Sequence, residues 1–337
     1  MSVSMKHAFA QGPAVAALGR VALSGLRNSQ RPASPQQGPG PWVEARLPAR
    51  PEQLVRDYIR HVGGDPAWYR GRLPPHLFPQ WGFALAARAL LGLGYPLARA
   101  INGGCRIENR APLPAGEPLD VRARIESIDD DGHRAIITQR VVTGTAEAPE
   151  ALVADLRAFI PLGDRNAEKA NGKKPAKARP TVPAGAHEIA FLRIREDAGL
   201  DFAKLTGDFN PIHWLKPYAR AAGFRTVILH GFSTVARAAE ALNRARFAGD
   251  PYRLKTLDVR LSRPLVLPAR VGVYVSAEGG VRTLERSESS DDTPKGVRTL
   301  ERSESSDDTP KGARIWVGDA PGGGAYLEGR FEAEARS

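Results

Sequence analysis

Cysteine and long apolar runs are nearly absent from this sequence. Its 337 residues include one cysteine, Cys105, so no disulfide can form within the chain and a reducing, cytoplasmic compartment is expected. No run of about 18 apolar residues occurs, so we expect no membrane-spanning helix. The seven histidines have no spacing typical of metal ligands, and we therefore expect no metal site.

Acidic side chains are missing from residues 1–43, which carry four basic groups. Residues 163–180 carry six basic groups and two acidic ones, so much of the net charge of +11 lies in these two stretches. Basic charge confined to tails and linkers argues against a nucleic-acid partner. The acid-free start resembles a mitochondrial transit peptide, which makes the mitochondrial matrix an alternative location. Otherwise it is a flexible basic tail.

The segment from Leu205 to Ser233 combines acid/base side chains with residues that bend the backbone. Asp208 and His213 are five residues apart, about 140° around a regular helix, so a single helix could not direct both at one atom. Pro211 interrupts a helix and favours an extended conformation at the residue before it. The resulting turn is predicted to direct a carboxylate and an imidazole at a shared water, which suits general acid/base catalysis.

The start of a helix follows in the sequence. Gly231 comes after the apolar run Val227 to Leu229, and a helical pattern continues to about Phe247. Ser233 or Thr234 is the expected N-cap. Glycine at a helix start leaves backbone N–H groups accessible to a ligand. We therefore predict an oxyanion site there, for a carbonyl group that gains negative charge.

These residues resemble the MaoC-like (R)-specific enoyl-CoA hydratase and dehydratase family of hot-dog proteins. The resemblance lies in a G-D-x-N-P-I-H motif at residues 207–213 and a following H-G at residues 230–231. In that family the acid and the histidine activate the water that adds to an enoyl thioester, and the glycine N–H polarises its carbonyl. The resemblance implies catalytic roles for Asp208 and His213, an oxyanion role for Gly231, and supporting polar roles for Asn210 and Ser233.

A diverged internal repeat relates the two halves of the chain. Trp81-Gly82-Phe83 matches His230-Gly231-Phe232, and in both places an arginine follows six residues after the glycine. The sequence around Asp65 resembles that around Asp208, but no Asn-Pro-x-His follows it. The repeat predicts an α+β tandem (double) hot dog, in which two long helices are each wrapped by a curved antiparallel sheet. One edge of each sheet would join the other, so that the chain forms a pseudo-dimer.

Composition sets the expected domain boundaries. A first hot dog without the catalytic pair is expected at residues 44–162 and a catalytic hot dog at residues 187–337. Residues 163–186, rich in lysine, alanine, glycine and proline, form the linker. The sequence VRTLERSESSDDTPKG occurs twice without change within residues 281–312. Because it has too little apolar content to bury a face, it is predicted to form a disordered surface loop.

The hydrophobic pattern predicts two helices in the first half, at residues 54–61 and 81–93, besides the helix after Gly231. Leu77, Phe78, Trp81 and Phe83 belong either to the wall of an acyl-chain tunnel or to an ordinary core. His76 is expected in a loop. Strands are predicted at residues 105–111, 119–128, 134–143, 151–161, 189–194, 252–261, 271–277, 314–317 and 325–331.

The expected activity is the reversible, (R)-specific hydration of a trans-2-enoyl-CoA in fatty acid or related acyl thioester metabolism. Coenzyme A or an acyl carrier protein would carry the substrate, and no cofactor is expected because the acid, the base and the N–H act directly. Family members often have a polar residue two places after the histidine, where this chain has Leu215. A non-catalytic acyl-thioester-binding protein and a thioesterase are the alternatives. A homodimer of double hot dogs is also expected.

Overall fold

The computed structural model describes residues 3–9, 11–12, 15–16, 19–20, 38–162, 179–276 and 313–334. Most of the expected linker, residues 163–178, lies outside the described residues. So does the repeated sequence at residues 281–312, for which a disordered loop is predicted.

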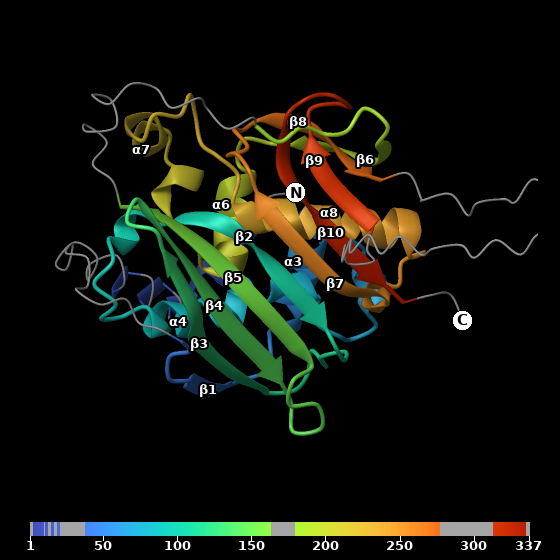
Figure 1. The fold of residues 1–337 in the computed structure, drawn as a ribbon. Coiled ribbons are helices and arrows are strands. Elements are labelled where there is room, and N and C mark those ends of the chain that lie inside the picture. Colours follow the sequence, from blue (N-terminus) through green and yellow to red (C-terminus); the bar gives the residue numbers. More distant parts are fainter. Residues whose placement is uncertain are drawn as a thin grey trace, which may run out of the picture.

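A ten-stranded antiparallel sheet is the main element of the fold (Figure 1). Its strand order, β1-β3-β4-β5-β2-β7-β10-β9-β8-β6, reads the same from both ends when each strand is exchanged for its counterpart in the other half. A pseudo-twofold axis therefore passes between β2 and β7. The strands are β1 (Val43–Leu47), β2 (Ile101–Asn109), β3 (Leu119–Asp130), β4 (Arg134–Gly144), β5 (Leu152–Pro161), β6 (His187–Ile194), β7 (Leu254–Leu261), β8 (Ala269–Val275), β9 (Ala313–Gly318) and β10 (Ala325–Ala333).

Alternating side chains give the sheet one buried face. Along β3, Leu119, Val121 and Ala123 are buried, whereas Asp120 and Arg122 between them are half-buried. This period of two places every second side chain against the helices. The turn at Asp130-Asp131-Gly132 joins β3 to β4, with Gly132 at φ +85° and the Asp130 carboxylate accepting its N–H at 2.8 Å.

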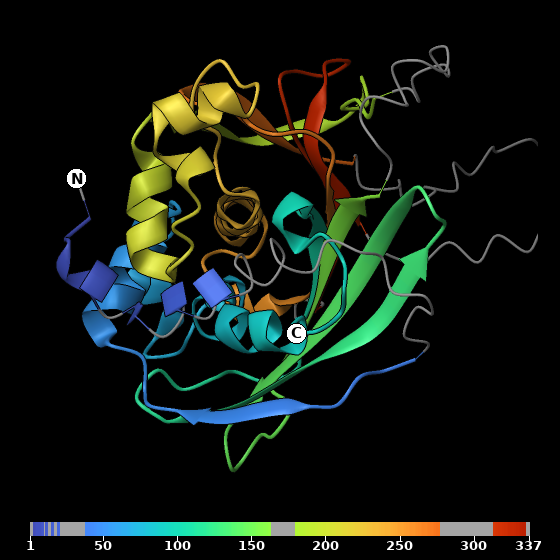
Figure 2. The same ribbon diagram turned by 90° about the vertical axis from the view of Figure 1, so that its left-hand side faces the viewer.

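Two long helices lie against the buried face of the sheet, α4 (Pro79–Ala89) and α8 (Gly231–Arg246). Figure 2, viewed nearly along α8, shows the sheet curving around this helix. The predicted α+β double hot dog is therefore confirmed. The shorter helices are α1 (Lys6–Phe9), α3 (Glu52–His61), α6 (Ala198–Thr206) and α7 (Lys216–Ala221), with 3-10 turns η1 (Pro66–Tyr69), η2 (Pro75–Leu77), η3 (Leu97–Arg99), η4 (Pro211–His213) and η5 (Pro251–Arg253).

Some boundaries differ from those predicted. Helix α8 begins at Gly231 with His230 as its N-cap, so Ser233 and Thr234 lie inside the first turn and cap nothing. Helix α4 begins earlier and ends earlier than predicted, and Gly92, at φ +86°, follows its end. Strand β1 was not predicted. None of the helices in the described ranges is long and apolar enough to span a membrane.

Strands β2 and β7 join the two halves in a seam. Cys105 faces Val259 across it and is fully buried, which raises the pKa of its thiol to about 12. A thiol with a raised pKa is a poor nucleophile, so Cys105 is a structural residue of the seam. Arg157 of the first half also forms an ion pair with Asp258 of the second.

Part of the expected basic tail packs on the helices. His7 of α1 is buried and lies 2.9 Å from the carboxylate of Asp57 on α3. Gln11 is 1% exposed, and its amide donates to the carbonyl of Leu205, in the last turn of α6, at 3.2 Å. The first residues thus contact helices from both halves, in contrast to a tail without contacts.

Candidate active site

The end of helix α6 sets the position of Asp208. The helix stops at Thr206 because Gly207 adopts φ +83°, a left-handed conformation that favours glycine. The chain then enters η4 at Pro211, and Asn210 caps this turn by accepting the N–H of Ile212 at 3.3 Å. Asn210 therefore has a visible structural role in holding the bend.

The bend brings Asp208 and His213 together, and with them His230. One carboxylate oxygen and one ring nitrogen from each histidine all lie within 4.8 Å of one another. The two imidazoles are stacked, with ring centroids 3.7 Å apart. The Asp208 carboxylate has a long contact, 3.4 Å, to the N–H of Asn210. The sequence spacing alone could not show that a second histidine joins the pair.

A backbone carbonyl fixes the tautomer of His213. Its Nδ1 lies 2.9 Å from the carbonyl oxygen of Ile228, and since a carbonyl only accepts, Nδ1 must carry the proton. In the neutral ring, Nε2 is then an unprotonated acceptor. Burial lowers the pKa of His213, which opposes the raising effect of the nearby Asp208 carboxylate. His213 is thus held as a neutral base at neutral pH.

His230 is held in the opposite tautomer. Its Nε2 donates to the backbone oxygen of Asp208 at 2.9 Å and lies 3.9 Å from the Asp208 carboxylate. Burial lowers its pKa to about 3, and the neighbouring His213 adds to this effect. Its Nδ1 is buried and has no hydrogen-bond partner in the described part of the chain. His230 therefore holds the Asp208 backbone in place. This role could be recognised only from the folded structure.

Gly231 is the first residue of α8, and no acceptor for its N–H is present among the described residues. A Cβ at this position would lie 2.2 Å from Cδ1 of Leu261, so a larger residue would have to displace that side chain. Ser233, two residues further along, is fully buried, and its hydroxyl has no partner within the residues described. The structure thus places an unused N–H and an unused hydroxyl at the start of one helix.

The aromatic residues suggested for an acyl tunnel mainly form core. Trp81 is buried and donates its indole N–H to Thr143 at 3.0 Å. The rings of Phe78 and Phe83 pack on Phe232, with centroids 5.7 and 5.2 Å away. Because Phe232 follows Gly231 directly, these side chains support the helix start from the first half.

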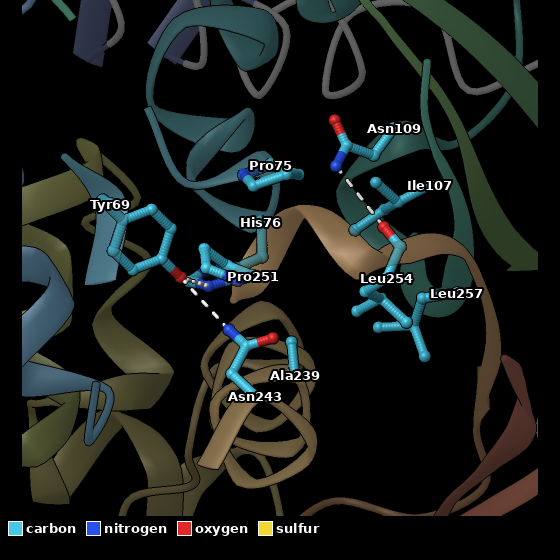
Figure 3. Close-up of a pocket in the computed structure, with 10 residues that line it drawn as sticks. All are labelled: Tyr69, Pro75, His76, Ile107, Asn109, Ala239, Asn243, Pro251, Leu254 and Leu257. Carbon is cyan, nitrogen blue, oxygen red and sulfur yellow. Dashed lines mark hydrogen bonds between the residues drawn. The ribbon is translucent and has the colours of Figure 1, made fainter. Parts of the chain in front are cut away.

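His76 is part of a second buried polar cluster, which corrects its expected place in a loop (Figure 3). Its Nε2 lies 3.2 Å from the carboxylate of Glu240 on α8, and the Tyr69 hydroxyl donates to the same oxygen at 2.6 Å. Tyr58 and Asn243 complete the cluster. The adjoining cavity of about 20 Å³ has room for roughly one water. This cluster does not include any member of the Asp208 site.

A basic groove lies in the second half of the chain. It has a volume of about 320 Å³, and Arg225, Arg263, Arg270 and Tyr326 contribute to its walls. Arg263 stacks on the ring of Tyr326 and pairs with Asp319, whereas Arg225 and Arg270 are exposed and form no ion pair with any described residue.

Backbone pairing connects one residue of this groove to the segment that orients His213. Val266 of the groove pairs with Ile228, whose carbonyl holds His213. One residue of the groove wall is therefore paired with the residue whose carbonyl orients His213.

Comparisons with known proteins show the family of this chain. Residues 170–298 match a family profile described as "MaoC like domain". The 3-hydroxyacyl-thioester dehydratase X of Mycobacterium tuberculosis is 32% identical over 215 residues, which cover 62% of this chain and 71% of that protein. This chain belongs to the MaoC-like dehydratase family.

Two further relatives extend the comparison. The enoyl-CoA hydratase ChsH3 of M. tuberculosis is 28% identical over 208 residues, covering 55% of this chain and 70% of that protein. The crystal structure of HtdX from M. tuberculosis superposes with a TM-score of 0.61 at 20% identity, over 87% of this MaoC-like chain and all of the other. The similarity to the HtdX structure concerns the fold alone.

Proposed function

We propose that this MaoC-like protein catalyses the reversible hydration of a trans-2-enoyl thioester to a 3-hydroxyacyl thioester. The proposal rests mainly on one observation. His213 has Nε2 free, has a ring nitrogen within 4.8 Å of the Asp208 carboxylate, and stacks on His230, which directly precedes Gly231 and its unused N–H. Two relatives support it, since they are named as a 3-hydroxyacyl-thioester dehydratase and an enoyl-CoA hydratase.

The geometry supports a direct addition of water. The water oxygen bonds to C3 of the enoyl group while its proton passes to Nε2 of His213, and the Asp208 carboxylate orients the water. Charge that develops on the thioester oxygen is stabilised by the N–H of Gly231. One of the two acid/base groups then returns a proton to C2. The (R) configuration of the product is the outcome that the family resemblance implies.

No metal is needed for these steps. Asp208, His213 and His230 come close enough to hold an ion, and each ring keeps one nitrogen that is not bonded to a backbone carbonyl, so a chelator tests for metal dependence. The decisive assay follows the loss of the conjugated thioester absorbance over a chain-length series, with and without a chelator. Loss of absorbance with a chiral 3-hydroxy product supports hydration, whereas thiol release from a saturated acyl-CoA would indicate a thioesterase. Binding without turnover would indicate a carrier or regulatory protein.

Coenzyme A, rather than an acyl carrier protein, is the carrier that the basic groove favours. Coenzyme A has three phosphates, and the unpaired arginines Arg225 and Arg270 offer charge-assisted hydrogen bonds to them. Arg225 precedes Ile228 by three residues, so its Cα lies within about 11 Å of the segment that holds His213. A cytoplasmic location and a homodimer are still expectations from the sequence and are not part of this proposal.

A matched substrate pair tests the choice of carrier. Replacing both Arg225 and Arg270 by glutamine is expected to raise the KM for the enoyl-CoA by about tenfold, and to leave the KM for the same enoyl group on pantetheine unchanged. Arg46→Gln, on the outer strand β1, is the control. Equal effects on both substrates, or none, would reject the groove as the nucleotide site.

A further inference from the structure

Asn102, at the start of β2, extends toward the tip of α8 from the half that lacks the catalytic pair. Its side-chain nitrogen lies 3.1 Å from the point that a Cβ on Gly231 would occupy. A backbone nitrogen is about 2.5 Å from its own Cβ position, so the Gly231 nitrogen and Nδ2 of Asn102 are at most about 5.6 Å apart. One oxygen that accepts hydrogen bonds of about 2.9 Å from both can bridge that separation.

The orientation of the Asn102 amide is set by a hydrogen bond. Its Oδ1 accepts the N–H of Gly104 at 2.9 Å, so Nδ2 must be the atom that faces Gly231. No acceptor for Nδ2 is present in the described ranges of the chain. The amide therefore presents unused donors beside the unused N–H of Gly231.

A β-bulge produces this placement. The register between β2 and β5 shifts between Asn102 and Gly104, and Gly104 has φ +116°. A Cβ on Gly104 would lie 2.0 Å from the carbonyl oxygen of Val259 across the seam, so no other residue fits. Bulges beside active sites redirect a side chain, and here the Asn102 side chain is turned to the helix tip.

We propose that Asn102 is a second oxyanion donor, supplied across the seam by the half without the catalytic pair. This inference rests on the proposed hydration and adds a catalytic residue to it. The thioester oxygen would accept one hydrogen bond from the Gly231 N–H and one from Nδ2 of Asn102. Both donors are fixed before the substrate binds, one by the helix and one by the bulge, so they stabilise developing charge without rearrangement.

Two substitutions separate this role from a structural one. Asn102→Asp keeps an oxygen for the N–H of Gly104 and removes the donor, whereas Asn102→Ala removes both. If Asn102 is a catalytic donor, both variants should lose about 100-fold or more in kcat. The Asn102→Asp variant should be at least as impaired as the Asn102→Ala variant. The urea midpoint of the Asp variant should stay at the wild-type value. Near wild-type kcat in the Asp variant together with a loss in the Ala variant would overturn the proposal.

A second readout does not depend on hydration. A bound 3-oxoacyl-CoA ionises more readily where donors stabilise its enolate oxygen, and the enolate absorbs in the near ultraviolet. The wild type should raise the enolate fraction, and Asn102→Asp should abolish the increase. Equal enolate in both proteins, or none in the wild type, would reject Asn102 as a donor. Failure of the wild type to hydrate any enoyl thioester would instead reject the proposed function and leave this readout decisive.

Discussion

The tips of the two long helices differ in the groups they present. Helix α8 begins with Gly231, whose N–H is unused, whereas α4 begins with Pro79, which has no N–H. Gly82, which matches Gly231 in the sequence repeat, lies inside α4 and donates its N–H to Phe78 at 2.8 Å. The two halves share a strand order, whereas their helix starts differ in whether the glycine N–H is already hydrogen-bonded.

The acidic residues of the two halves differ in the same way. Asp65 accepts the N–H of Ala67 at 2.9 Å and caps η1, and no histidine stands in that turn. Asp208 has only a 3.4 Å contact of this kind and faces two imidazoles. A carboxylate used as a cap supports local structure, whereas one left beside a neutral base can orient a water.

The largest effect is expected from substitutions of Asp208 and His213, compared with a substitution of Asp65. Asp208→Asn or His213→Ala should lower kcat by roughly two to four decades, because each removes an acid/base group. Asp65→Ala should instead leave kcat unchanged and lower the unfolding free energy by about 1 kcal/mol through loss of a cap. Enoyl-CoA hydration rates and urea unfolding measure both. Near wild-type turnover in either dyad variant would refute the assignment.

Gly231→Ala and Gly82→Ala test whether the two matching glycines have different roles. The first should lower kcat by about 100-fold, because the new methyl group meets Leu261 and displaces the oxyanion donor. The second places a methyl group 3.1 Å from the side chain of Val141, which can shift, and should change stability by no more than about 1 kcal/mol. Steady-state kinetics of both variants decide. Equal activity losses would mean that the two tips are not distinct.

The second polar cluster should affect stability and not chemistry. Glu240→Ala leaves His76, Tyr69 and Asn243 without their shared buried partner, which should lower the unfolding free energy by about 3 kcal/mol. At temperatures where the variant is folded, kcat should match the wild type. Glu334→Ala, which removes an exposed pair with Lys255, serves as the control. A selective loss of kcat would connect this cluster to the site.

The pH dependence should report the burial of the histidines. Burial lowers the pKa of His213 below 6.5, so its neutral, proton-accepting form persists below that pH and kcat/KM should fall only at lower pH. The free energy of unfolding should also decrease as the pH falls from about 6.5 toward 3. In that range unfolded imidazoles bind protons, whereas His230, with a pKa of about 3, stays neutral. An acid limb above pH 6.5 would contradict a buried base.

Local sequence predicted the bend at Pro211 and the helix after Gly231, because proline and glycine act on their immediate neighbours. It could not reveal that His230 braces the Asp208 backbone, since that contact joins segments 22 residues apart. Asn102 was missed for a similar reason, because its direction depends on a bulge formed by pairing between strands. The Glu240 cluster also needed tertiary contacts, with 164 residues separating it from His76.

The seam between β2 and β7 limits how this chain could be divided. Cut within the linker, either fragment would expose an unpaired strand edge whose residues, such as Cys105 and Val259, are buried in the intact sheet. Such edges recruit other chains and promote aggregation. The second fragment would also keep Glu240 without the tyrosines and histidine that surround it. The first half, which lacks the Asp and His pair, is therefore needed to cover the sheet edge of the second. Deleting the first half should give an insoluble fragment and not a smaller enzyme.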